Sequence, residues 1–306
     1  MLKPPFQLRE RRDFGQLISG SFALLRQHGR PLYRAIGISC LPPLLFAAYL
    51  IGGGFSEITS NVGKGIVGGE DRAVYGGFMI AAAYGLFALL FVYLHALVHE
   101  FLRALDRRET QAITTAILVT CAVTRIFHYA GILIITGLMV AASTIVFILL
   151  FTLNEPVITV VSAIAMMAAV FAVFTYASLA SASQAMERNG VTTSLQRSFK
   201  LVSGDFWPTL GVSMVMGLIV GAMGYIVQLL GMLVMMLLMF VGASGDNEAM
   251  NTLMPIIMAL FFGLQFAVML GTYPLPCTCL TLKLCSRIEE QEGHGLRSRI
   301  ESFETM

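Results

Sequence analysis

Six long apolar segments constrain this chain more than any other feature of its sequence. Each segment is nearly free of charged residues and has the length, about 20 helical residues, that crosses roughly 30 Å of hydrocarbon. Backbone polar groups in lipid must be hydrogen-bonded within their own segment, so we expect these segments to be helices. The sequence therefore predicts an all-α, polytopic membrane protein with six transmembrane helices, at roughly 32–53, 75–98, 129–153, 157–183, 209–241 and 252–282.

The composition supports a membrane protein over a soluble domain with one anchor. Hydrophobic residues make up 57% of the chain and charged residues only 12%, whereas soluble domains average about 25% charged residues. The five cysteines have neither the spacing of a disulfide framework nor that of a metal-ligand motif. We therefore predict one integral membrane domain over residues 1–306 without structural disulfides.

The distribution of positive charge predicts the orientation of the spans. Of the 20 Lys and Arg residues, only Lys64 and Arg72 fall on the outer side of the six-span arrangement. Lys and Arg accumulate in cytoplasmic loops of membrane proteins. We therefore predict a multi-pass protein of the bacterial inner membrane with both termini in the cytoplasm and a short cytoplasmic tail at 284–306.

An internal repeat is the second informative feature. Three copies, at 14–98, 110–183 and 191–283, each begin with a short cytoplasmic helix that leads into two spans. Gly29 and Pro31 separate the first of these helices from its span, and Gly204 and Pro208 do so in the third copy. The middle helix, expected at 110–128, has a wider apolar face than the other two. The predicted architecture is thus three pseudo-repeats of an interfacial helix plus two spans.

Basic residues and the single tryptophan lie where these short helices meet the spans. An apolar face at the headgroup boundary with cations beside it is typical of helices that contact anionic lipid. An equal alternative is that the short helices pack as structural collars on the cytoplasmic ends of the spans, and the two roles are compatible. The predicted lipid-interface residues are Arg26, Arg30, Arg34, Arg125, Arg197, Lys200 and Trp207.

The third copy carries a resemblance to a known group of proteins. It contains Asn-Gly-Val at 189–191, Ser-Leu-Gln-Arg-Ser-Phe-Lys-Leu at 194–201 and Phe-Trp-Pro at 206–208. This element resembles one in the YciC-like bacterial inner-membrane proteins and in the membrane domain fused to some glycerophosphodiester phosphodiesterases. The resemblance implies the architecture and no activity, because the stand-alone members have none assigned and the soluble phosphodiesterase domain is absent from this sequence.

Two histidines provide the best candidate for chemistry. His95 and His99 lie one helical turn apart, a spacing that zinc or iron can use, and His128 is expected at the same membrane boundary as a third ligand. The alternative is that the two rings are polar residues at the end of a span. We favour this alternative because no acidic ligand completes a recognisable motif, and we predict no catalytic residue, metal or cofactor.

The function expected from the sequence is that of a non-enzymatic accessory or scaffold protein that acts on lipids or on a membrane protein partner at the cytoplasmic leaflet. No nucleic-acid-binding motif is found. A transporter or lipid-translocating permease is the first alternative, with Gln228 as the main polar group deep in the fifth span. A metal-dependent membrane enzyme built on His95 and His99 is the second.

Overall fold

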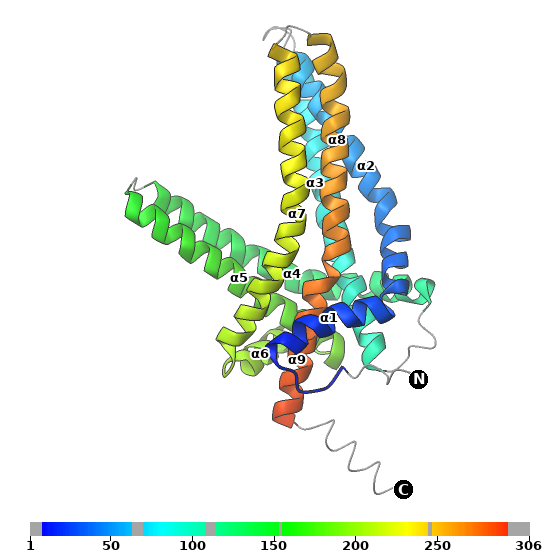
Figure 1. Ribbon diagram of the computed structural model, residues 1–306, viewed down its shortest axis with the longest axis vertical. Coiled ribbons are helices and arrows are strands. Elements are labelled where there is room, and N and C mark those ends of the chain that lie inside the picture. The colour runs from blue at the N-terminus through cyan, green and yellow to red at the C-terminus, as the bar shows by residue number, and fades with distance from the viewer. Residues whose placement is uncertain (1–7, 63–69, 108–113, 153–154, 244–246, 293–306) are drawn as a thin grey trace, which may run out of the picture. The chain divides into compact units, whose positions relative to one another are not determined.

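The structure is a computed structural model that describes residues 8–62, 70–107, 114–152, 155–243 and 247–292 (Figure 1). Over these residues the chain forms helices joined by short connections. The helices are α1 Phe14–His28, α2 Arg30–Val62, α3 Glu70–Asp106, α4 Thr115–Phe151, α5 Pro156–Glu187, α6 Val191–Val202, α7 Phe206–Ala243, α8 Asn247–Thr272 and α9 Pro274–Glu292.

The all-α, six-span prediction is confirmed. Six stretches of the described helices are long and apolar enough to cross a membrane. Many of their large side chains point away from the protein, among them Ile134, Leu138 and Leu149 of α4 and Val160 and Ile164 of α5, each more than half exposed. Such continuous apolar surfaces are unfavourable in water and suit lipid contact. The chain is therefore a multi-pass membrane protein.

Local sequence explains where the first two helices begin and end. The side chain of Asp13 accepts a hydrogen bond from the backbone N–H of Gln16 at 2.7 Å, and Gln16 Oε1 accepts one from the Asp13 backbone at 3.1 Å. This capping box satisfies donors that have no partner inside the helix. Gly29 ends α1, and Pro31 occupies the first turn of α2, where its missing N–H is not needed. The predicted break at Gly29 and Pro31 is confirmed.

The second predicted interfacial helix is not separate from its span. Residues 110–113 lie outside the described residues, and from Thr115 the chain continues as one helix, α4, to Phe151. Between Thr115 and Tyr129 there is no Gly or Pro that would end a helix, whereas α6 is separated from α7 by 203–205. The threefold repeat remains a prediction, and its middle copy differs from the pattern expected.

The sixth predicted span is divided. Helix α8 ends at Thr272, Tyr273 forms a turn, and α9 starts at Pro274. Proline removes a backbone donor and clashes with the preceding helical turn. Helix α8 therefore ends before Pro274, and the polar end of the segment forms a helix of its own.

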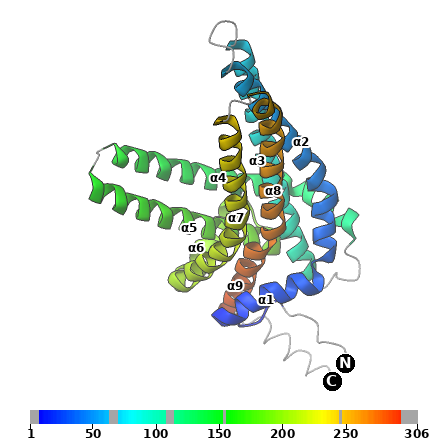
Figure 2. The same cartoon turned by 45° about the horizontal axis from the view of Figure 1, so that its top comes forward.

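The chain divides into two compact units. The first contains residues 1–32, 95–218 and 274–306. Helix α9 is almost completely buried in this unit and packs against α1 and α5, while α4 and α5 lie side by side as a hairpin in both views (Figures 1 and 2). The buried run Ala-Ser-Leu-Ala-Ser-Ala-Ser at 177–183 lets neighbouring helices approach α5 closely.

The second unit contains residues 33–94 and 219–273, which are most of α2, α3 and α8 and the second half of α7. A Cβ atom on Gly54 of α2 would lie 2.7 Å from the carbonyl oxygen of Gly76 in α3, and the reverse holds for Gly76. The rings of Phe87 and Phe266 stack with centroids 3.6 Å apart. Small residues and stacked rings thus let these apolar helices pack closely.

Candidate functional site

The most polar part of the first unit's interior lies on the last turns of α3. His95, His99 and Glu100 are 2%, 0% and 3% exposed. Their spacing puts His95 directly one turn before His99, and the two rings lie edge to face with centroids 4.5 Å apart. Three buried polar side chains on one helix end require partners from other helices, because burial without hydrogen bonds is costly.

Helix α9 brings a cysteine to the two histidines. One ligand atom each from His95, His99 and Cys277 lies within 4.8 Å of the others. Cys277 is 1% exposed and forms no disulfide. The donors are two imidazole nitrogens and one sulfur, a set typical of sites for soft transition metals.

Helix α5 orients His95. The Ser181 hydroxyl donates to the backbone carbonyl of Ala177 at 2.9 Å, and the Ser181 oxygen lies 2.7 Å from His95 Nε2. Because the serine hydrogen is already used, the serine oxygen accepts from His95 Nε2–H. In this tautomer the lone pair of the imidazole ring lies on Nδ1. Hydrogen bonds of this kind orient the histidines that bind metals in proteins.

His99 has a different environment. Neither of its ring nitrogens forms a hydrogen bond with any residue of the described part of the chain. Its ring stacks on Tyr129 of α4, with centroids 5.8 Å apart and an interplanar angle of 14°. A fully buried imidazole without a hydrogen-bond partner is uncommon in proteins and needs a physical explanation.

Glu100 is buried and paired. Its Oε2 accepts from Arg103 Nη1 at 2.7 Å, and its Oε1 accepts from the Tyr129 hydroxyl at 3.0 Å. Arg125 of α4 lies 3.7 Å from the same Oε1. The carboxylate is thus balanced by two guanidinium groups, which makes it a link between α3 and α4 and leaves it poorly suited to act as a metal ligand or base.

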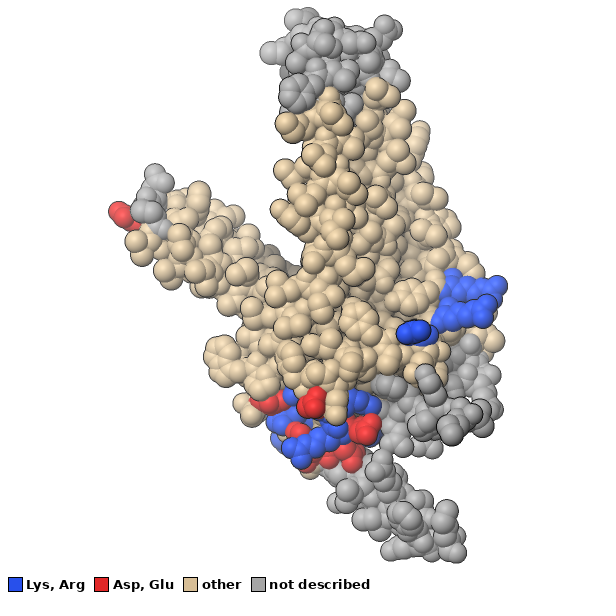
Figure 3. All heavy atoms as spheres, viewed as in Figure 1, with Lys and Arg blue, Asp and Glu red and all other residues tan. Residues whose placement is uncertain are grey.

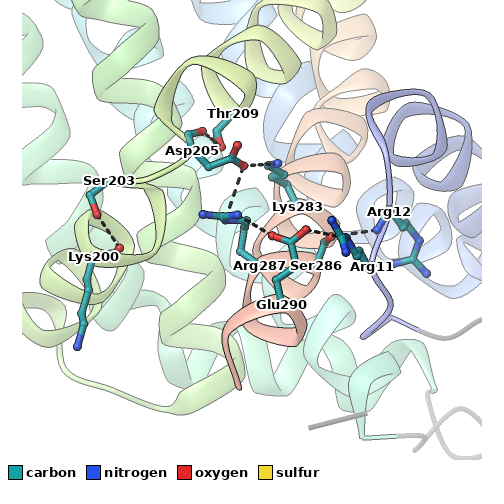
Figure 4. A network of polar contacts seen from close by, with 10 residues as sticks. All are labelled: Arg11, Arg12, Lys200, Ser203, Asp205, Thr209, Lys283, Ser286, Arg287 and Glu290. Carbon is teal, nitrogen blue, oxygen red and sulfur yellow. Dashed lines mark hydrogen bonds and ion pairs between the residues drawn. The ribbon is translucent and has the colours of Figure 1, made fainter. Parts of the chain in front are cut away.

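A second polar network holds the far end of α9 (Figure 4). Asp205, just before α7, lies 2.5 Å from Lys283 Nζ and 3.6 Å from Arg287 Nε. Glu290 pairs with Arg287 at 2.6 Å and with Arg11 at 3.1 Å. In Figure 3 a mixed group of red and blue atoms lies around this end of the unit, further blue atoms lie separately at the right of the view, and the sides of α4 and α5 are tan apart from a red group at their tip. These contacts fix the position of α9 and with it that of Cys277.

The N-terminal segment joins the same end of the unit. Arg9 donates two hydrogen bonds to Asp106, at 3.0 and 2.8 Å, and these bonds raise the pKa of Arg9. The backbone N–H of Arg12 donates to the Ser286 hydroxyl at 3.0 Å, and burial lowers the pKa of the Arg12 side chain. Residues 8–13 therefore tie the end of α3 to α9.

The sequence-predicted site residues divide into two groups. His95 and His99 lie together as expected, but His128 is exposed on α4, where its carbonyl accepts from Gln184 Nε2 at 3.4 Å. His128 is thus outside the cluster and Cys277 takes the place expected for it. Gln228, on which the transporter alternative depends, is exposed on α7.

The predicted lipid-interface residues also differ among themselves. Five are exposed: Arg26, Arg30, Arg34, Lys200 and Trp207. The other two are in ion pairs, because Arg197 lies 3.2 Å from Glu187 and Arg125 lies beside Glu100. Only the exposed residues are available to lipid headgroups without breaking a contact.

Sequence reasoning did not find Cys277, Ser181 or Tyr129 as neighbours of the histidines. No local spacing connects them, because they come from α9, α5 and α4 and meet only in the folded unit. The available signals were the prolines before Cys277, which create α9, and the run of small residues around Ser181.

The fold and the site define a multi-pass, all-α membrane protein with a buried histidine–cysteine cluster. No family model, curated protein or solved structure matches the chain. Its function is therefore inferred from its own residues.

Proposed function

We propose that this chain is a non-enzymatic protein of the bacterial inner membrane, with both termini in the cytoplasm, that acts as an accessory or scaffold by binding anionic lipid at the cytoplasmic leaflet. A membrane protein partner bound at the same surface is compatible with this role. The resemblance of 189–212 to the YciC-like group agrees with the proposed membrane and architecture.

One observation carries the proposal. Arg26 at the end of α1 and Arg30 and Arg34 at the start of α2 are all exposed. They recur every fourth residue across a connection of a single glycine, and none has an ion pair with a residue of the described ranges. Basic residues that are already paired contribute little to lipid binding, whereas free ones beside a span contribute about 1 kcal/mol each at an anionic surface.

The buried polar groups support a non-catalytic role. Glu100 accepts hydrogen bonds from Tyr129 and Arg103 and pairs with Arg125. His95 is hydrogen-bonded to Ser181. A general acid or base must be able to reach a substrate proton. These groups are directed at one another inside the unit instead.

The proposal is tested on the full-length protein extracted into polymer nanodiscs. Mass spectrometry measures the ratio of anionic to zwitterionic lipid around the protein and in bulk membrane, and it identifies any co-purified protein. The test variant is R26Q/R30Q/R34Q, and the matched control is R26K/R30K/R34K, which retains the charge. We expect anionic lipid to be enriched around the wild type and the lysine variant and not around the glutamine variant.

Salt provides a second readout. The Debye length falls from about 10 Å at 0.1 M to about 3 Å at 1 M ionic strength, so the enrichment should decline when lipids are exchanged at high salt. Equal enrichment in the glutamine and lysine variants would contradict the proposal. Substrate flux in proteoliposomes that Gln228→Leu abolishes would replace it with the transporter alternative.

A further inference from the structure

The histidine–cysteine cluster is not used by the proposed function, and it contains the least satisfied buried group of the first unit. His99 is 0% exposed, and both of its nitrogens lack a hydrogen-bond partner in the described part of the chain. It faces His95 and Cys277, with ligand atoms of the three residues within 4.8 Å of one another. An imidazole that has given up water without a protein partner is expected to have a ligand of another kind.

The other two donors are arranged for the same ligand. The hydrogen bond to Ser181 holds the proton of His95 on Nε2, so Nδ1 is the ring nitrogen that carries the lone pair a metal would bind. Cys277 contributes a thiolate once it is deprotonated, and metal binding drives that deprotonation. Metal bonds of about 2.0–2.1 Å to imidazole and 2.3 Å to thiolate would bring the three atoms to roughly 3.5 Å apart. The cluster therefore has to contract by about 1 Å.

The number of ligands and the charge of the site select the ion. The cluster of described residues offers three donors, whereas structural zinc sites take four. Thiolate and imidazole suit copper(I), a soft ion that is stable with three ligands. Copper(I) with one thiolate is also neutral. A divalent ion would leave a positive charge in a buried site that already has Arg103 and Arg125 around one carboxylate, and burying an unpaired charge is costly.

We propose that this protein binds one copper(I) ion through His95 Nδ1, a ring nitrogen of His99 and the sulfur of Cys277. The ion joins α3 to α9, and the ion pairs of Asp205 with Lys283 and Arg287 hold α9 in the position that this requires. Ser181 is a positioning residue, because it acts on the metal only through the tautomer of His95. This inference is independent of the lipid-binding role.

The experiment titrates the purified full-length protein in nanodiscs with copper(I) alone, without oxygen, and in parallel with zinc alone. Binding is measured by competition with a copper(I) chelator and by elemental analysis after desalting. X-ray absorption at the copper edge counts nitrogen and sulfur neighbours. We expect one copper(I) per chain, with two nitrogen ligands and one sulfur ligand at bonding distance.

The variants separate the proposed ligands from their neighbours. His99→Gln and Cys277→Ser should weaken copper(I) binding at least 10-fold, and Ser181→Ala should weaken it about 10–100-fold. The matched controls are His128→Gln, on the exposed histidine, and Cys279→Ser, on a buried cysteine of the same helix. Both controls should bind one copper(I) with the affinity of the wild type.

Three results would overturn the proposal. They are saturation with zinc but not with copper(I), copper(I) binding that survives Cys277→Ser unchanged, and a wild-type absorption spectrum without a sulfur ligand. The last result needs no variant, so it decides the question even if a substitution prevents folding.

Discussion

Replacement of Tyr129 by Phe isolates one buried hydrogen bond between α4 and α3. The ring is 1% exposed and its hydroxyl donates to Glu100 Oε1 at 3.0 Å. Phe retains the ring, so no large cavity forms and only the bond is lost. A hydrogen bond to a charged group contributes about 1.5–3 kcal/mol. Because Arg103 still pairs with Glu100, we expect a loss of about 2 kcal/mol, or about 30-fold in the ratio of folded to unfolded protein.

The assay is reversible unfolding in mixed micelles of a nonionic detergent and dodecyl sulfate. Tyr225→Phe is the matched control, since Tyr225 is 58% exposed and its hydroxyl should contribute less than about 0.5 kcal/mol. In a Glu100→Gln background the acceptor is neutral, so Tyr129→Phe should cost less than about 1.5 kcal/mol. If Tyr129→Phe loses no more unfolding free energy than Tyr225→Phe, the hydrogen bond to Glu100 does not stabilise the first unit.

The same assay checks three further substitutions. Gly76→Ala places a Cβ 2.7 Å from the carbonyl oxygen of Gly54 and should destabilise the protein by about 1–3 kcal/mol. In the matched control Gly77→Ala the new Cβ has no atom within 4 Å, so this variant should be more stable than the wild type by about 0.5–1 kcal/mol. Equal effects of the two substitutions would contradict the close approach of α2 and α3. Asp205→Asn removes the carboxylate that Lys283 and Arg287 share, although Arg287 still pairs with Glu290, and it should cost about 1.5–3 kcal/mol. An unchanged unfolding midpoint would contradict this prediction. Asp106→Asn removes the negative charge that accepts two hydrogen bonds from Arg9, so residues 8–13 should become less resistant to proteolysis. Unaltered cleavage would show that the ion pair of Arg9 and Asp106 does not hold this segment in place.

Local sequence accounts for the helices and for most of their ends. Apolar length predicts the spans, and Gly29 and Pro274 mark two breaks that depend on backbone chemistry alone. The prediction of a separate helix at 110–128 is wrong within the described residues. An apolar face that widens toward the span is also the pattern expected for the first turns of the span itself. Amphipathicity indicates which face is buried, but it does not determine whether two helical segments join.

The candidate site could be predicted only in part. His95 and His99 are neighbours through helical spacing, which the sequence displays directly. His128 was the natural third candidate by membrane depth, yet it points outward because a helix presents only one face to its unit. The sequence predicts how deep a residue lies in the membrane. It does not predict which faces of three or four helices meet, and a set of metal ligands depends on that.

The sequence by itself determines that this chain is an all-α membrane protein with six spans, because hydrophobicity and backbone hydrogen bonding act along the chain. Only the tertiary structure places Cys277 of α9 beside His99 of α3, with Ser181 of α5 holding the tautomer of His95. That arrangement depends on close packing of small residues and on ion pairs that fix α9. These contacts join residues far apart in the chain, so no local pattern encodes them.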